Sequence, residues 1–376
     1  MKRVRVSELV PGMITAEDIY SFNNQLVVEK NTVLTDEIIT RLEYHSVLSI
    51  RVVDEGSTGA VALPQTSEDL FADDKGFAGT PETMSYSERI KATKRFMEFQ
   101  KTFTANTEAL QGHLHDIIEN NSINTGVMLQ SVSSLISKGT TSIGVFDMLH
   151  NMRTYDDLTY VHSMSVSVIC NIFGHWIGYG EEDIKNVTLA GLLHDIGKIA
   201  IPQDIVKKPS KLTNDEYKII KQHTIEGYKI LKNLPLDNRI KDAALLHHER
   251  FDGSGYPLSV TGDKVSEYAK IVAIADVYDA MTAARVYRGP MCPFKVISIF
   301  EEEGLQKYDS RLILVFLQNI SQTYLNNRVR LNNGVEGDVV LIHNDCISRP
   351  LIKCLDGRFI DLSAPENKSL SIEELI

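Results

Sequence analysis

The sequence predicts a mainly α-helical protein with a small α+β module at its start and a short β-rich element at its end. Residues 84–326 carry apolar side chains at three- and four-residue steps, which is the spacing of amphipathic helices. Residues 1–53 alternate apolar and polar positions in short runs. Residues 327–376 alternate in the same way around Asn-Gly and Asp-Gly pairs, which are typical of hairpin turns.

The chain has 376 residues and a mass of 42.2 kDa, a length that predicts two or three folded units at about 100–200 residues each. Hydrophobic residues make up 43% and charged residues 24%, which excludes wholesale disorder. The net charge of -11 argues against a broad basic face for phosphate contacts. We therefore expect no polymeric nucleic acid among its partners.

The elements follow one another in a clear order. Residues 1–53 predict the small α+β module, with a helix over DEIITRLEYHSV, and residues 54–83 are rich in Gly, Ser, Thr, Asp and Pro and predict a linker. Residues 84–152 predict a connector of two or three helices, interrupted at ENNSINTG. Residues 153–326 predict a helical domain with polar loops, and residues 327–376 the β-rich element.

Cysteine usage and the first residues indicate a cellular compartment. The four cysteines form no C-x-x-C pair, so neither a disulfide framework nor a zinc ribbon is indicated, and a reducing cytoplasm fits best. The basic start MKRVRV is not followed by the apolar stretch of a signal peptide, and no run approaches the ~18 apolar residues of a membrane span. We expect a cytoplasmic protein without a membrane segment.

The chemistry is concentrated in the helical domain. A single histidine on a helix is more often a core or surface residue than a ligand, but here five histidines and two aspartates gather in one region. Imidazole and carboxylate together suit Fe, Mn, Co or Zn. Seven side chains exceed the needs of one tetrahedral ion, and a carboxylate can bridge two ions, so the pattern predicts a two-metal hydrolase site. The seven are His162, His194, Asp195, His223, His247, His248 and Asp276.

A lysine follows the His-Asp pair. In LAGLLHDIGKIAIP, Lys198 lies four residues after His194 and shares its helical face if the helix continues through Gly197. We expect its ammonium beside the metals; the alternative is a lysine that extends into solvent from a helix end.

Two further segments follow the candidate ligands. The loop after His247 and His248 contains Gly253, Gly255 and Pro257; glycine allows a close backbone approach, although an ordinary loop would look similar. In ADVYDAMTAARVYRGP, Asp276 and Asp279 are neighbours on one face. Downstream of them, Arg285 and Arg288 are either solvated surface residues or a clamp for phosphate or a guanine edge.

Together these segments resemble the HD-GYP family of HD-domain metal phosphohydrolases. The resemblance covers residues 150–325, in the family's order and with similar gaps, and its motifs are highly specific: TYVHSMSVS, HDIGK, KQHTIEGY, HHERFDGSGYP and the helix from Asp276 to Arg288. It implies a helical HD-type bundle that hydrolyses cyclic di-GMP to pGpG, which family members often cleave further to GMP; the sequence leaves open which of the two is the product here. Residues 1–53 resemble, more loosely, a module often found ahead of this domain.

The resemblance also assigns roles to the residues. All seven side chains named above would be metal ligands, with Asp195 bridging the ions, and Lys198 would hold a phosphate oxygen. Arg285 and Arg288 would contact substrate, and Tyr256, flanked by Gly255 and Pro257, would border the nucleotide or signalling partner proteins.

Two positions depart from the family pattern. Members with a third metal carry Glu at the position of Leu158, and Asp157 is one step out of register, so we expect two divalent ions, Fe or Mn. The family's Pro between the matching Arg and Tyr is Val286, which alters the approach of Arg288 without removing it.

The expected mechanism is in-line attack on phosphorus by a hydroxide that bridges the two ions, with the 3′ oxygen leaving. Asp195 and Lys198 are the predicted catalytic residues. Two alternatives stay open: an HD hydrolase of another cyclic dinucleotide or nucleotide, and a non-catalytic cyclic di-GMP receptor. The apolar stripe in 84–152 either supports a homodimer or forms intramolecular core.

Overall fold

A computed structural model describes most of the chain from residue 90 onward and parts of the first 52 residues. The described residues are 2–5, 9–10, 12–16, 19–20, 26–28, 30–35, 38–39, 42, 49–52, 90–138, 142–152, 158–208, 210–283 and 291–376. The chain forms two compact units, Met1–Asp69 and Leu70–Ile376. The expected linker, residues 54–83, lies outside the described residues.

The first unit contains two small antiparallel sheets. Strand β1 (Lys2–Arg5) pairs with β4 (Ser49–Val52), and β2 (Ile19–Tyr20) pairs with β3 (Leu26–Val28). The alternation of the sequence places one side of each strand inside, where Val4, Ile19, Val28 and Ile50 share a small core. Most of the predicted helix over DEIITRLEYHSV lies outside the described residues.

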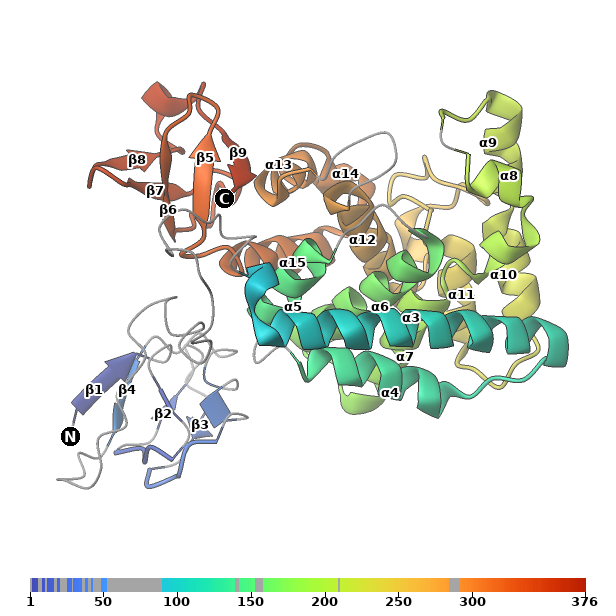
Figure 1. Ribbon diagram of the computed structural model, residues 1–376, viewed down its shortest axis with the longest axis horizontal. Helices are drawn as coiled ribbons and strands as arrows, with labels where there is room; N and C mark the ends of the chain where they lie inside the picture. Colours follow the sequence, from blue (N-terminus) through green and yellow to red (C-terminus); the bar gives the residue numbers. More distant parts are fainter. Residues whose placement is uncertain are drawn as a thin grey trace. The chain divides into compact units, whose positions relative to one another are not determined.

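The second unit is built mainly of helices (Figure 1). They are α3 (Lys94–Asn120), α4 (Thr125–Ile136), α5 (Ser142–Asn151), α6 (Leu158–Trp176), α7 (Glu181–Leu193), α8 (Gln203–Val206), α9 (Asn214–Ile220), α10 (His223–Leu231), α11 (Asn238–Leu246), α12 (Glu267–Thr282), α13 (Pro293–Ile299), α14 (Leu305–Lys307) and α15 (Ser310–Gln322). Three short turns join them: the 3₁₀ segments η4 (Ile196–Ala200) and η5 (Gly262–Lys264), and the π segment η6 (Phe300–Gly304).

Helix α3 packs its apolar stripe inside the chain. Phe96, Phe99, Phe103, Leu110 and Leu114 are buried on one face, and α3 contacts α4 and α6. The stripe predicted in residues 84–152 therefore forms intramolecular core, which was one of the two alternatives for it. A homodimer stays a prediction.

A close helix pair lies at the centre of this unit. Gly191 of α7 faces α6 so closely that a Cβ there would lie 2.9 Å from Cys170 Sγ and 3.0 Å from Ser167 Cα. The absence of a side chain lets the two helices approach. Their approach brings the rings of His162 and His194 to a centroid separation of 5.2 Å.

The chain ends in a five-stranded antiparallel sheet of order β8-β7-β6-β5-β9. Its strands are β5 (Arg328–Leu331), β6 (Glu336–Leu341), β7 (Leu351–Cys354), β8 (Phe359–Asp361) and β9 (Ile372–Leu375), followed in Figure 1 by the label C. The Glu301 carboxylate of η6 accepts hydrogen bonds from the amides of Ile347 and Ser348, at 2.6 and 3.2 Å. These bonds tie the sheet region to the helices.

The predicted fold class is confirmed: the protein is mainly α-helical, with a small β-sheet at its C-terminal end. Among the described helices, none has the combination of length and apolar character that crossing a bilayer requires.

Candidate metal centre

The structure brings all seven predicted ligands together from five helical segments. His162 lies on α6, His194 and Asp195 directly follow α7, His223 begins α10, His247 and His248 directly follow α11, and Asp276 lies within α12. Their ligand atoms form three groups, and the atoms of each lie within 4.8 Å of one another. The groups are His223–His247–His248, His162–His194–Asp276 and His194–Asp195–His247.

Asp195 lies between two sets of histidines. Its Oδ2 is 3.3 Å from Nε2 of His194 and 3.7 Å from Nε2 of His162. Its Oδ1 is 3.3 Å from Nε2 of His223 and 3.9 Å from Nε2 of His247. Each carboxylate oxygen thus faces a different pair of imidazoles, which is the arrangement that a bridging ligand requires.

Backbone carbonyls fix the tautomers of three of these histidines. Nδ1 of His194 lies 2.7 Å from the carbonyl oxygen of Gly191, Nδ1 of His223 lies 2.6 Å from that of Ile220, and Nδ1 of His247 lies 2.9 Å from that of Ala243. A carbonyl only accepts, so Nδ1 donates in each case and a neutral ring carries its lone pair on Nε2. All three Nε2 lone pairs therefore face the interior of the cluster.

The pKa shifts keep most of these rings neutral. Burial lowers the pKa of His223 and, together with the neighbouring His248, holds the pKa of His247 well below its usual range. Burial also lowers the pKa of His248 to about 3. Burial by itself raises the pKa of Asp195, but Lys198 and His194 outweigh it and hold that carboxyl well below its usual range. Neutral imidazoles and an ionised carboxylate are the forms that bind metal ions.

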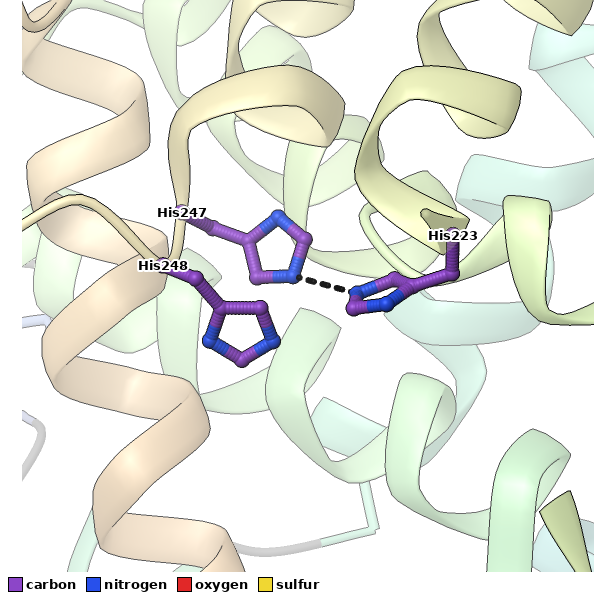
Figure 2. A group of neighbouring side chains, drawn as sticks. All are labelled: His223, His247 and His248. Atoms are coloured by element: carbon purple, nitrogen blue, oxygen red, sulfur yellow. Dashed lines mark hydrogen bonds between the residues drawn. The ribbon is translucent and has the colours of Figure 1, made fainter. Parts of the chain in front are cut away.

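Two buried ligand atoms lack hydrogen bonds. Within the part of the chain that the structure describes, neither His194 Nε2 nor Asp195 Oδ1 has a hydrogen-bond partner. Nε2 of His223 and Nε2 of His247 lie 3.3 Å apart, although both are lone-pair atoms in the tautomers deduced above. The dashed line in Figure 2 joins these two atoms. Buried hydrogen-bond acceptors that lie close together without donors destabilise the folded state, unless a cation lies among them. The donor set therefore fits divalent metal ions.

His162 is held differently, by two carboxylates of α12. Its Nδ1 lies 2.8 Å from Asp279 Oδ2, and its Nε2 lies 3.0 Å from Asp276 Oδ1. Burial alone lowers the pKa of His162, but these two hydrogen-bonded carboxylates raise it to about 9. Asp279 thus orients the ring through the nitrogen that faces away from the cluster, as carboxylates do behind metal-bound histidines.

The HDIGK segment differs from the predicted geometry. Helix α7 ends at Leu193, and residues Ile196–Ala200 form a 3₁₀ turn, so the helix does not continue through Gly197. Lys198 consequently reaches the carboxylate of Asp195, with which it forms an ion pair through Oδ2, instead of lying along a helical face with His194. The ammonium still lies beside the candidate metal ligands.

The loop after His248 is held by a buried glutamate. Oε1 of Glu249 accepts hydrogen bonds from the amides of Leu258 and Ser259 at 2.6 and 3.0 Å, and Oε2 accepts one from Val260 at 3.2 Å. A Cβ at Gly255 would lie 2.4 Å from Glu249 Cα, so the absence of a side chain there lets the loop backbone pack closely on the backbone of Glu249. The ring of Tyr256 lies 4.7 Å from that of His248, between centroids.

These groups open onto one large cleft of about 990 Å³. His162, Lys198, His248, Tyr256 and Asp276 line it on the side of the candidate ligands. Such a volume is at the upper end of small-molecule sites, which span roughly 300–1,000 Å³. The cleft can therefore admit a ligand as large as a dinucleotide.

Comparison with known proteins identifies one part of the chain. A family model described as "HD domain" matches residues 145–312. Residues 145–312 form an HD domain. The predicted resemblance is confirmed, since its motifs fall within this domain.

Three curated relatives match about half of the chain or less. A cyclic di-GMP phosphodiesterase of Pseudomonas aeruginosa is 32% identical over 206 residues, which are 54% of this chain and 50% of the relative. A 3′3′-cGAMP-specific phosphodiesterase of Vibrio cholerae is 37% identical over 44% of this chain and 39% of its own length. A cyclic di-GMP phosphodiesterase of Thermotoga maritima is 35% identical over 46% and 48%, respectively. The chain thus spans half or less of each relative's length.

Several predicted positions of the HD domain lie outside the described residues. They are Asp157, Arg285, Val286 and Arg288, together with the side chain of Leu158. The substrate contacts predicted for the two arginines therefore stay predictions.

Sequence reasoning assigned no role to several residues that the structure places at the site. Asp279 follows Asp276 by three residues and Glu249 directly follows His248, but only the structure shows what they hold. Arg250, Lys207 and Lys211 line the cleft, and no role was predicted for them.

Proposed function

We propose that this protein is a metal-dependent phosphodiesterase that hydrolyses a cyclic dinucleotide, cyclic di-GMP in the first place. The observation that carries the proposal is the convergence of histidine Nε2 atoms around Asp195, with two buried atoms left without hydrogen bonds. The HD domain around it, shared with phosphodiesterase relatives, indicates the reaction class.

Two divalent ions, Fe or Mn, would be held by the seven side chains. His162, His194 and Asp276 form one group and His223, His247 and His248 form the other, while the oxygens of Asp195 face both. Mixed imidazole and carboxylate ligands suit these metals. When bound, such ions lower the pKa of a coordinated water and offset the charge of phosphate oxygens.

The chain's own residues would bind and orient the substrate. Lys198 lines the cleft beside Asp195, so its ammonium can donate to a phosphate oxygen of a bound phosphodiester and stabilise the negative charge that grows there. Tyr256, packed on the ring of His248, borders the place where the nucleotide would lie. Asp279 keeps the His162 ring in one orientation through Nδ1.

A second candidate substrate is 3′3′-cGAMP. It is favoured by the 37% identity to a relative whose name specifies that dinucleotide. Both candidates present two phosphodiesters on a ring of two nucleotides, and they differ in one base. A cytoplasmic location, signalling partner proteins and a homodimer stay predictions.

The test is chromatographic analysis of cyclic di-GMP and 3′3′-cGAMP, each incubated with the pure protein, with metals quantified on the same sample and Fe or Mn added back. We expect about two ions per chain and linear products from one of the two substrates. His194→Ala combined with Asp195→Ala should abolish both metal content and turnover, with the fold checked by circular dichroism.

Three outcomes would count against the proposal in different ways. Full turnover by the folded double variant would refute the metal mechanism. Tight binding of cyclic di-GMP without turnover at full metal content would indicate a receptor. No bound metal under any condition would contradict the interpretation of the cluster itself.

A further inference from the structure

The cleft has a second cationic side, supplied by the segment between α8 and α9. Lys207, Lys208 and Lys211 line the same cleft as His162 and Asp276, although the chain as a whole carries a net charge of -11. In Figure 1 this segment joins the two short helices α8 and α9 of the second unit. A concentration of cations in the cleft of an acidic protein indicates an anionic ligand.

One of the three lysines anchors the segment. Nζ of Lys208 lies 2.7 Å from both carboxylate oxygens of Glu216. The same glutamate forms a capping box with Thr213, accepting from its amide at 2.7 Å, and so begins α9. Lys208 is therefore neutralised, and its ion pair fixes the course of the chain between α8 and α9.

The other two lysines keep their charge available. Lys207 and Lys211 are exposed, and neither has a carboxylate partner among the residues that the structure describes. They lie on either side of the anchored Lys208 in the sequence and line the cleft with it. Unpaired lysine charges beside a cleft attract phosphate groups as point charges.

We propose that Lys207 and Lys211 form a subsite for the second, non-scissile phosphodiester of the substrate. The proposal rests on the function proposed above. A cyclic dinucleotide carries two phosphodiesters, and the metal cluster with Lys198 accounts for only one of them. The ring holds the second at a fixed distance from the first, so it needs a separate cation in the same cleft. Among the described residues that line the cleft, Lys207 and Lys211 are exposed lysines without a carboxylate partner.

The experiment uses the metal-loaded full chain and compares two double variants. Lys207→Ala with Lys211→Ala removes the subsite. Lys101→Ala with Lys353→Ala removes the same charge from exposed positions on α3 and β7 that do not line the cleft. Both are assayed on cyclic di-GMP and on bis(p-nitrophenyl) phosphate, which has a single phosphodiester. Lys207→Arg with Lys211→Arg tests whether charge alone restores binding.

We expect the Lys207→Ala, Lys211→Ala variant to raise KM for cyclic di-GMP about tenfold, because it loses two charge contacts that solvent partly screens. Its kcat should stay within about twofold of the wild type. Its effect on KM for bis(p-nitrophenyl) phosphate should be several times smaller, and the double Arg variant should recover most of the loss. The effect should also shrink at high salt, since these charges are exposed.

The outcomes separate this proposal from the one on which it rests. If wild-type protein turns over cyclic di-GMP and both double Ala variants show the same KM, the subsite is refuted and the phosphodiesterase stands. An equal rise in KM for both substrates would also refute it, because the lysines would then act on any phosphodiester. If the wild type turns over neither cyclic dinucleotide, the proposed function fails and the subsite fails with it.

Discussion

The substitution Gly197→Ala tests how the HD segment builds the metal centre. Gly197 lies in η4 against the start of α10, and a Cβ there would be 1.9 Å from the carbonyl oxygen of His223 and 2.4 Å from the amide nitrogen of Gly227. Real Cβ atoms essentially never approach other atoms within 3.0 Å. Both neighbours are backbone atoms, so no side chain can rotate away and the two segments must separate by about 1 Å.

That separation acts directly on the ligands. Asp195 immediately precedes η4 and His223 begins α10, and their facing atoms, Oδ1 and Nε2, are now 3.3 Å apart. Metal sites tolerate ligand displacements of only about 0.2 Å. We expect Gly197→Ala to lower the free energy of unfolding by about 1–3 kcal/mol or more, the usual cost of overpacking, and to reduce metal content below half of the wild type.

The assay measures metal per chain on purified protein and urea unfolding of the same preparation. Gly112→Ala is the matched control. Gly112 is exposed in the middle of α3, and no atom lies within 4 Å of a Cβ placed there. It should bind metal normally and gain about 0.5–1 kcal/mol of stability from its better helix propensity. A Gly197→Ala protein with wild-type metal content and an unchanged unfolding midpoint would refute the packing explanation.

Two further predictions concern Glu249 and His162. Glu249→Gln turns one acceptor oxygen into an amide donor that must face a loop amide, such as that of Val260, and should lower the free energy of unfolding by about 1.5–3 kcal/mol in urea titrations. Glu249→Asp, which keeps both oxygens, is the control; a Gln variant at least as stable as wild type would contradict the role of the carboxylate. In metal-free protein, the pKa of His162 is raised from 6.5 to about 9, so its stabilising contribution is complete below pH 6.5 and is lost as pH rises through 9. After removal of metal with a chelator, the urea unfolding midpoint of the wild type should fall between pH 6.5 and 9 more steeply than that of His162→Gln. The same pH dependence in both proteins would contradict the prediction.

Much of the helical fold, and the set of side chains that the structure brings together at the candidate site, were predictable from sequence. Local patterns decide them: helical spacing predicted the helices of the second unit, and Asn-Gly and Asp-Gly pairs predicted turns where Gly334 and Gly357 have φ of 83° and 85°. The last strand, β9, falls within the predicted β-rich element, although its sequence IEEL follows no turn pair of that kind. The seven candidate ligands stood out because five histidines and two aspartates gather in one helical region.

Contacts between distant segments were not predictable. The 3₁₀ turn at Ile196–Ala200 replaces a helix because Gly197 packs on backbone contributed by α10, about 30 residues later. The role of Asp279 depends on α12 lying beside α6, more than 100 residues earlier in the chain. Spacing along the sequence reveals neither approach. The cationic side of the cleft was missed for the same reason: its lysines became informative only when the fold placed them in one cleft with His162 and Asp276.

The ends of helices explain why the ligands are oriented before any metal arrives. The last carbonyls of a helix have no amide partner within it, and a histidine placed there can satisfy one through Nδ1. At the end of α7, Nδ1 of His194 donates to the carbonyl of Gly191, and Nδ1 of His223 donates to that of Ile220, the last residue of α9. At the end of α11, the carbonyl of Ala243 accepts both the backbone amide and Nδ1 of His247. In each case the hydrogen bond at Nδ1 leaves Nε2 facing Asp195. The ends of α7, α9 and α11 therefore orient three imidazoles toward the candidate metal site.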